Sequence, residues 1–376
     1  MTISSREMAR LPAVDVTLRA VERIATAPTA PYHEARALRA IAAALGDSGI
    51  ETTTDAYGQL HARVHKGDAK RTLALVAHTD HPAFEITSAS GREGRAKILG
   101  GFYARFFGQD VPVLVCDDEN TAPFRATLDD YVTVLDEANN SLGHCRIRAE
   151  AELHAGQWAV LDLPGFAARG DELHLRAADD LALCAVIALT LDGLRDERAP
   201  FDVRAVFTRA EETGLYGARL VAEDGLLPRD AIVVSLEASR ALPHARAGAG
   251  VVVRPGDVYN TFSNDGERFL RVARERLSEA NIPTQRALLT GGTCESSAFV
   301  RLGFTTSAIA LPNVNYHNQS EESTRFVPEI VRLSDLRGAV ALLIEGALAA
   351  GGDVDESWWP DVKVVPAEIR TRLRRG

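Results

Sequence analysis

The chain has little of what would place it outside the ordinary globular class. Only four of its 376 residues are cysteines and no two form a CxxC pair, which argues against a disulfide framework or a cysteine-built zinc site. Its longest apolar runs, at 181–189 and 339–344, fall short of the roughly 18 residues of a membrane span. We therefore expect no membrane contact and interpret four thiols as reduced: Cys116, Cys145, Cys184 and Cys294.

The chain also lacks a basic excess and a recognisable leader. Lys plus Arg number 42 against 52 Asp plus Glu, a net charge of −10, so no positive surplus exists to neutralise the phosphates of a nucleic acid. The N-terminus carries Glu7 and has neither an apolar core nor a small-residue cleavage site. We expect a cytoplasmic protein without a nucleic-acid partner.

What is present is typical of a globular protein. Hydrophobic residues make up 46% and charged residues 25% of the chain, and its length suits about two domains. Before residue 84 and after residue 168, helical spacing alternates with short apolar strands. Between them, residues 84–168 form short, turn-broken extended segments. The sequence therefore predicts one α/β domain interrupted by an inserted all-β domain.

Individual elements follow from periodicity and from turn residues. Helices are predicted at 18–25, 34–49, 181–194, 215–223, 266–280 and 327–350, with a short helix inside 291–303. Strands are predicted at 52–64, 72–78, 202–208, 232–237 and 305–310, and within the insert at 111–116, 131–136 and 158–163.

Polar side chains stand at or just beyond the ends of three predicted strands. In open α/β sheets, ligands gather outside the carboxyl ends of the strands, so we expect these side chains to converge. A lone histidine at a strand end is alternatively a hydrogen-bonded structural residue, and a Glu-Glu turn is alternatively a solvated surface. The residues are His78, Asp80, Glu211, Glu212 and Glu237.

Two further groups extend this set. Asp179 and Asp180 precede the apolar helix, where helix capping would account for one of them, although neighbouring carboxylates repel unless a cation lies between them. His317 stands in a polar loop after the strand at 305–310. Two histidines with three carboxylates suit two borderline divalent ions such as zinc. Such a pair would lower the pKa of a shared water and polarise a carbonyl, which is the chemistry of amide hydrolysis, with a further carboxylate as base.

The same motifs, in the same order, carry a resemblance to a known family. They are HTD at 78–80, DD at 179–180, EETGLYGA at 211–218, Glu237, and YH at 316–317, of which EETGLYGA is the most specific. The set resembles that of co-catalytic dinuclear metallopeptidases and is nearest to the glutamyl-aminopeptidase group, which includes the tetrahedral, cellulase-M-like aminopeptidases.

The resemblance implies an architecture. It gives an α/β, zinc-exopeptidase-like catalytic domain at 1–83 and 169–376, whose mixed sheet is sandwiched by helices. A small β-barrel-like domain at 84–168 is inserted into it and serves oligomerisation or substrate access.

The resemblance also implies roles for the ligand candidates. Asp179 would bridge two metal ions, most readily zinc, with cobalt and manganese as alternatives. His78 and Glu237 would complete one site, and Glu212 and His317 the other.

Two more roles rest on the same resemblance. Glu211 would be the general base, and Asp80 would hydrogen-bond the far nitrogen of His78 and so fix its tautomer. The Asp179–Asp180 peptide is expected to be cis.

The position of the insertion separates this group from the dimeric carboxypeptidase and deacylase branch. His78 and Asp179 are 101 positions apart, whereas Glu237 and His317 are only 80 apart, so the surplus chain lies early. Glu237 stands where aminopeptidases mostly have Asp and carboxypeptidase relatives often have Glu.

We therefore expect a cytoplasmic, homo-oligomeric aminopeptidase acting on short peptides. A carboxypeptidase, an N-acyl amino-acid amidohydrolase and a non-catalytic oligomeric binding protein remain alternatives. Arg240 and Arg254 would favour acidic residues unless they are solvated surface arginines, and Cys294 is interpreted as a small buried hydrophobe.

Overall fold

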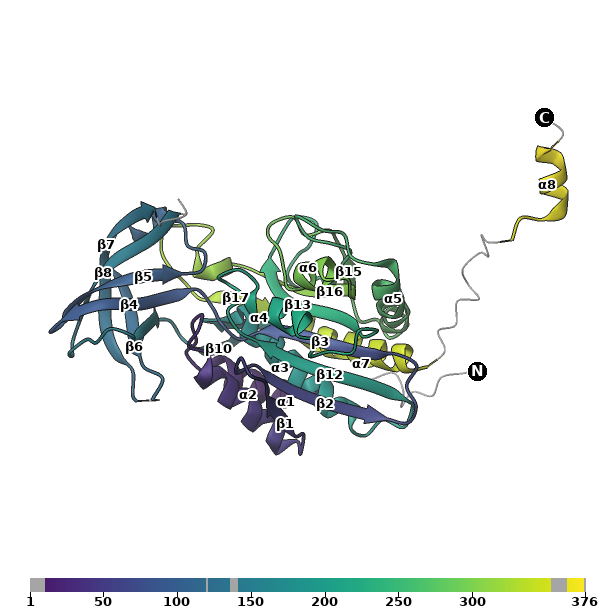
Figure 1. Ribbon diagram of the computed structural model, residues 1–376, viewed down its shortest axis with the longest axis horizontal. Coiled ribbons are helices and arrows are strands. Elements are labelled where there is room, and N and C mark those ends of the chain that lie inside the picture. The colour runs from purple at the N-terminus through teal and green to yellow at the C-terminus, as the bar shows by residue number, and fades with distance from the viewer. Residues whose placement is uncertain (1–10, 120, 136–140, 353–363, 375–376) are drawn as a thin grey trace.

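The computed structural model describes residues 11–119, 121–135, 141–352 and 364–374. An α/β body lies beside a closed β-barrel, which occupies one end of the long axis (Figure 1). Two predictions fall partly outside the described residues. They are the interpretation of the N-terminus, which includes residues 1–10, as lacking a secretory signal, and the end of the predicted strand at 131–136, which includes residue 136.

The body is built on an eight-stranded mixed sheet in the order β1-β2-β12-β3-β13-β16-β14-β15. The four central strands β12, β3, β13 and β16 run parallel, while β2 and β14 flank them antiparallel. The strands are β1 (Thr52–Thr54), β2 (Leu60–Lys66), β3 (Thr72–His78), β12 (Phe201–Thr208), β13 (Ile232–Arg240), β14 (Val251–Arg254), β15 (Thr284–Arg286) and β16 (Thr305–Asn313).

Helices cover both faces of the sheet, because the central strands are apolar on both sides. Leu73 and Leu75 of β3 pack into the core that contains α3 and α7, whereas Ala74 and Val76 pack against α4 and α6 on the other face. The helices are α1 (Val14–Ala25), α2 (Ala35–Asp47), α3 (Ala178–Leu194), α4 (Tyr216–Glu223), α5 (Asn264–Glu279), α6 (Ser296–Arg301), α7 (Leu333–Gly351) and α8 (Ala367–Leu373).

The inserted β segment closes into a barrel in the order β4-β5-β8-β7-β6-β9. Alternate residues fill its interior, as Val111, Val113 and Val115 of β6 do. This confirms the predicted β-barrel-like insert, and the exact limits 84–168 stay a prediction. The strands are β4 (Ala83–Ser90), β5 (Glu93–Leu99), β6 (Val111–Cys116), β7 (Phe124–Leu135), β8 (Ser141–Ala149) and β9 (Trp158–Leu161), with the short helix η1 (Ala104–Phe107) between β5 and β6.

The prediction of one helix over 327–350 is wrong at its start. Residues Glu329–Arg332 form β17, which pairs antiparallel with β11 (Glu172–Leu175) in a three-stranded sheet completed by β10 (Phe166–Arg169). The apolar residues at 327, 330 and 331 fit helical spacing, but the free edge of β11 offers inter-strand hydrogen bonds that local periodicity cannot reveal. Among the described helices, none is both long and apolar enough to cross a membrane.

Candidate active site

The carboxyl ends of the parallel strands bring the predicted site residues together. His78 is the last residue of β3 and pairs in parallel register with Thr208, the last residue of β12. The turn after β12 carries Glu211 and Glu212, and Glu237 lies near the end of the neighbouring strand β13. The remaining residues arrive from the start of α3 and from η2 (Tyr316–Asn318) after β16, and they are Asp179 and His317.

Asp179 lies between the two imidazoles. Its Oδ1 is 3.1 Å from Nε2 of His78, and its Oδ2 is 3.5 Å from Nε2 of His317. The same His317 nitrogen is 3.3 Å from Oε1 of Glu212. Two potential metal-binding groups therefore share Asp179, with ligand atoms within 4.8 Å of one another: His78 with Asp179 and Glu237, and Asp179 with Glu212 and His317.

These atoms are buried and short of hydrogen-bond partners. His78 and Asp179 are fully buried, and Glu237 and His317 are only 3% and 7% exposed. Unpaired buried polar atoms are costly, so a cluster of them is typical of a site that binds a ligand. Imidazole nitrogen and carboxylate oxygen are donors that suit zinc and similar divalent ions, so the site fits such ions. Among the described residues, the atoms without a hydrogen-bond partner include Asp179 Oδ2, Glu212 Oε1, Glu237 Oε2 and His317 Nε2.

The protonation equilibria of the cluster reflect crowded negative charge. Burial raises the pKa of Glu211 and Glu237 well above the ordinary value, and neighbouring carboxylates add to the rise. Burial alone would lower the pKa of His78 and His317, but the adjacent carboxylates raise both well above the usual value. Burial opposes ionisation of Asp179 too, yet the two neighbouring imidazoles hold its pKa below the usual value. Without a cation, protons compensate the carboxylates.

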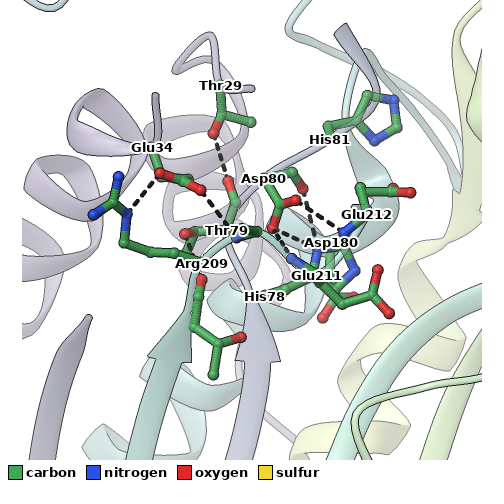
Figure 2. A network of polar contacts seen from close by, with 12 residues as sticks. Thr29, Glu34, His78, Thr79, Asp80, His81, Asp180, Arg209, Glu211 and Glu212 are labelled. Atoms are coloured by element: carbon green, nitrogen blue, oxygen red, sulfur yellow. Dashed lines mark hydrogen bonds and ion pairs between the residues drawn. The ribbon is translucent and has the colours of Figure 1, made fainter. Parts of the chain in front are cut away.

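Two buried carboxylates hold the turn that carries Glu211 and Glu212 (Figure 2). Asp80 accepts the N–H of Glu211 through Oδ1 and that of Glu212 through Oδ2, both at 3.0 Å. Glu34 accepts the N–H of Ala210 at 3.0 Å and the Nε–H of Arg209 at 2.6 Å. Three successive backbone N–H groups of the turn thus donate to carboxylates of other segments. The first residue of the three, Ala210, has a left-handed φ of 53°.

Asp80 also lies beside His78, but mainly through its backbone. Nδ1 of His78 is 3.1 Å from the Asp80 carbonyl oxygen and 3.5 Å from Asp80 Oδ1. The carbonyl is the nearer acceptor, while the carboxylate is engaged with the glutamate turn. The predicted hydrogen bond from His78 to the Asp80 side chain stays a prediction.

Sequence reasoning missed Glu329. This residue is fully buried, and its Oε1 accepts the N–H of His317 at 2.7 Å while its Oε2 accepts the N–H of Asp179 at 3.0 Å. It therefore ties two ligand candidates to β17. Its position was hidden because residues 327–350 read as one helix.

Asp180 is a second residue whose structural role the sequence did not predict. Its Oδ1 accepts the N–H of Ala238 at 3.1 Å, which holds β13 next to Glu237. Asp179 and Asp180 have non-helical φ and ψ, so the regular turns of α3 begin after them. The side chains of the two residues contact His78, His317 and Ala238, and helix capping by one of them stays an alternative. The Asp179–Asp180 peptide is cis, as expected.

A small pocket opens beside Glu237, with a cavity volume of ≈ 20 Å³. Arg254 lines it and is only 2% exposed, so the solvated-surface alternative is wrong for this residue, whereas Arg240 is exposed. Arg254 Nη1 donates to Ser239 Oγ at 3.1 Å, and its buried Nε has no hydrogen-bond partner among the described residues. Cys294 is fully buried, and burial raises the pKa of its thiol to about 11, which confirms the interpretation as a buried hydrophobe.

Solved structures share this fold over nearly their whole length. The TET1 peptidase of Pyrococcus horikoshii matches with a TM-score of 0.71 at 21% identity, over 88% of this chain and 99% of the other. An aminopeptidase of the archaeon Desulfurococcus kamchatkensis matches with a TM-score of 0.72 at 20% identity, over 94% and 99%. A TET aminopeptidase from a marine sediment thaumarchaeon gives a TM-score of 0.74 at 19% identity, over 91% and 98%. They confirm an α/β fold with an inserted barrel.

Sequence comparison matches one family model to part of the chain. No curated protein matches the sequence. The sequence model described as M42 glutamyl aminopeptidase matches residues 145–330, just under half of the chain, and this segment contains every predicted site residue except His78 and Asp80. The match confirms the resemblance drawn from the motifs: residues 145–330 match an M42 glutamyl aminopeptidase domain, and the chain is a peptide hydrolase.

Proposed function

We propose that the chain is a dinuclear metal-dependent aminopeptidase. His78, Asp179 and Glu237 would hold one divalent ion, and Asp179, Glu212 and His317 the other. The observation that carries this proposal is the placement of Asp179, each of whose carboxylate oxygens faces a different buried imidazole. When bound, the two ions would supply Lewis acidity toward the scissile carbonyl and the attacking water. Zinc fits the donor set best, and cobalt or manganese would also fit.

Glu211 is the proposed general base. Its carboxylate lies within 4.8 Å of ligand atoms of His78 and Glu212, at the edge of the ligand cluster. It would take a proton from the attacking water as the new C–O bond forms, and deliver that proton to the amine nitrogen as the C–N bond breaks. Asp80 and Glu34 would hold the base in place through the three backbone N–H groups of its turn.

The pocket beside Glu237 favours an acidic N-terminal side chain. A buried guanidinium requires a counter-charge and hydrogen bonds; Glu237 in the same pocket supplies part of the charge, and Arg254 Nε still lacks a hydrogen-bond partner among the described residues. A glutamate or aspartate side chain entering from the site would meet Arg254, with Arg240 at the same pocket. Short peptides beginning with Glu or Asp are therefore the proposed substrates.

The test is hydrolysis by metal-replete protein with Glu211→Gln as the variant. Wild-type protein should release the first residue of a free-amine dipeptide, while Glu211→Gln should lose turnover and retain its metal. Full activity of metal-replete Glu211→Gln would contradict the base assignment. Faster cleavage of the N-acylated dipeptide than of the free-amine dipeptide would contradict the direction and favour an amidohydrolase.

We further propose that the protein forms a homo-oligomer, with the barrel as a contact region. One similar structure, PhTET1-12s, is a dodecamer, and the TET1 peptidase of Pyrococcus horikoshii can assemble into a tetrahedron or a large octahedral shell. Light scattering coupled to gel filtration should give a mass several times the chain mass of 40.6 kDa, and a monomer would contradict this.

A further inference from the structure

The two imidazoles of the proposed metal centre are held in different ways. Nδ1 of His78 lies 3.1 Å from the carbonyl oxygen of Asp80, two residues away in the same segment. Nδ1 of His317 lies 2.8 Å from the carbonyl oxygen of Gly101, which belongs to the segment between β5 and β6 of the barrel. One orienting contact is therefore local, and the other comes from the inserted domain.

The Gly101 contact determines which nitrogen of His317 is available. A carbonyl oxygen only accepts, so the hydrogen bond requires the proton on Nδ1 and, in the neutral imidazole that binds a metal, leaves the lone pair on Nε2. Nε2 is the atom that faces Asp179 and Glu212 and has no hydrogen-bond partner. Partners of this kind typically change metal affinity 10–100-fold when they are removed.

The backbone around His317 needs such outside support. His317 has a φ of 56°, and its neighbours Asn315 and Asn318 have φ values of 60°. Non-glycine residues rarely adopt this left-handed conformation, and it persists where the surroundings hold it. The N–H of His317 is held by Glu329, and its ring by Gly101.

The barrel segment is itself clasped by the chain that follows His317. Tyr103 donates its N–H to Oε1 of Gln319 at 2.8 Å. Phe326, from the chain just before β17, lies with its ring centroid 5.3 Å from Phe102, 5.2 Å from Phe106 and 5.4 Å from Phe107. In Figure 1 this chain reaches from β17 to the barrel.

The two glycines of the same segment lie close to Pro82 and His317 of the catalytic domain. A Cβ at Gly100 would lie 3.0 Å from Cβ of Pro82, and one at Gly101 would lie 3.4 Å from the His317 ring. The segment thus fits between Pro82 and His317 with little free space. Moving the barrel away would withdraw the carbonyl from His317 without disturbing the local contact of His78.

We propose that residues 100–107 of the barrel are a positioning element for His317, so that docking of the barrel onto the Phe326 loop sets occupancy of the metal site formed by His317 and Glu212. This inference rests on the proposed dinuclear function. It makes the two sites unequal: the site of His78 and Glu237 is complete within the catalytic domain, and the other requires the docked barrel.

The test is calorimetric titration of metal-free full-length protein with Co²⁺, combined with metal analysis after dialysis. Phe326→Ala removes the aromatic clasp and leaves every ligand in place. Its control, Ile147→Ala, removes a buried barrel residue opposite Gly94, at the far end of β5 from the 100–107 segment. We expect two ions in wild type and in Ile147→Ala, whereas Phe326→Ala should bind its second ion about 10–100-fold more weakly and resemble His317→Ala.

A second variant with its own control tests the inference if Phe326→Ala does not fold. In Gly101→Val the added methyl groups meet the His317 ring, whereas a Cβ at Gly108 meets nothing closer than 3.9 Å. Gly101→Val should weaken the second ion only, and Gly108→Val should bind as wild type does. Two tight ions in Phe326→Ala and in Gly101→Val, or equal weakening in Ile147→Ala, would overturn the inference. Wild-type protein that binds no metal would instead overturn the proposed function.

Discussion

Replacement of Asp80 by Asn tests how far the Asp80 carboxylate stabilises the turn that carries Glu211 and Glu212. Each Asp80 oxygen accepts one backbone N–H at 3.0 Å, and Asn offers only one acceptor oxygen and places an NH₂ group opposite the other N–H. A hydrogen bond to a charged group contributes about 1.5–3 kcal/mol, so Asp80→Asn should lower the free energy of unfolding by about that amount. Since Glu211 then loses its fixed position, we expect kcat/KM to fall about 10–100-fold.

Asp335 supplies a matched control. It too is buried, and its two oxygens accept one backbone N–H each, from Gly250 at 2.8 Å and Gly248 at 2.7 Å. Asp335→Asn should destabilise the protein in the same way without lowering kcat/KM. Denaturant unfolding and steady-state kinetics on metal-replete variants measure both quantities. Equal losses of kcat/KM in the two variants, or wild-type kcat/KM in Asp80→Asn, would refute the assignment of Asp80 as the holder of the catalytic turn.

Three further predictions follow from the site and the core. Arg254→Met should lower the ratio of kcat/KM for Glu- over Leu-substrates about 10–100-fold, since a charged hydrogen bond of about 1.5–3 kcal/mol is lost; an unchanged ratio would exclude Arg254 as the selectivity residue. In metal-free protein, the folded state binds more protons than the unfolded state, because folding raises the pKa values of Glu211, Glu237, His78 and His317. The Tm should therefore fall as pH rises from about 5 to about 8, and a rising Tm would contradict this. The four cysteines are buried, and burial raises the pKa of Cys116 and Cys294 to about 11 and that of Cys145 to about 12. They should therefore resist a thiol reagent until the protein unfolds, and rapid labelling of the native protein would contradict their burial.

The sequence was most informative where local pattern and tertiary environment agree. The run at 72–78 coincides with β3 and that at 111–116 with β6, because a strand buried on both faces or lining a barrel must carry its own apolar pattern. The ligand candidates could be found for a related reason: polar residues at strand ends stand out against apolar strands, and parallel strands bring their ends together.

What could not be foreseen depends on contacts between distant segments. β17 pairs with β11, about 160 positions earlier, and no local signal separates it from the helix that follows. The same error concealed Glu329, and the hydrogen bond from His317 to Gly101 joins residues 216 positions apart. Glu34 gave no signal either, because a single glutamate before a helix is ordinary surface composition. Such supporting residues become visible only when their hydrogen bonds are known.

The central claim is that two divalent ions lie on either side of Asp179, and crystallographic anomalous scattering tests it most directly. Crystals of metal-replete protein measured at the absorption edge of the bound metal should give two peaks about 3.5–4 Å apart, one beside His78 and Glu237 and the other beside Glu212 and His317. No peak within reach of Asp179, or peaks bound only by other residues, would contradict the account.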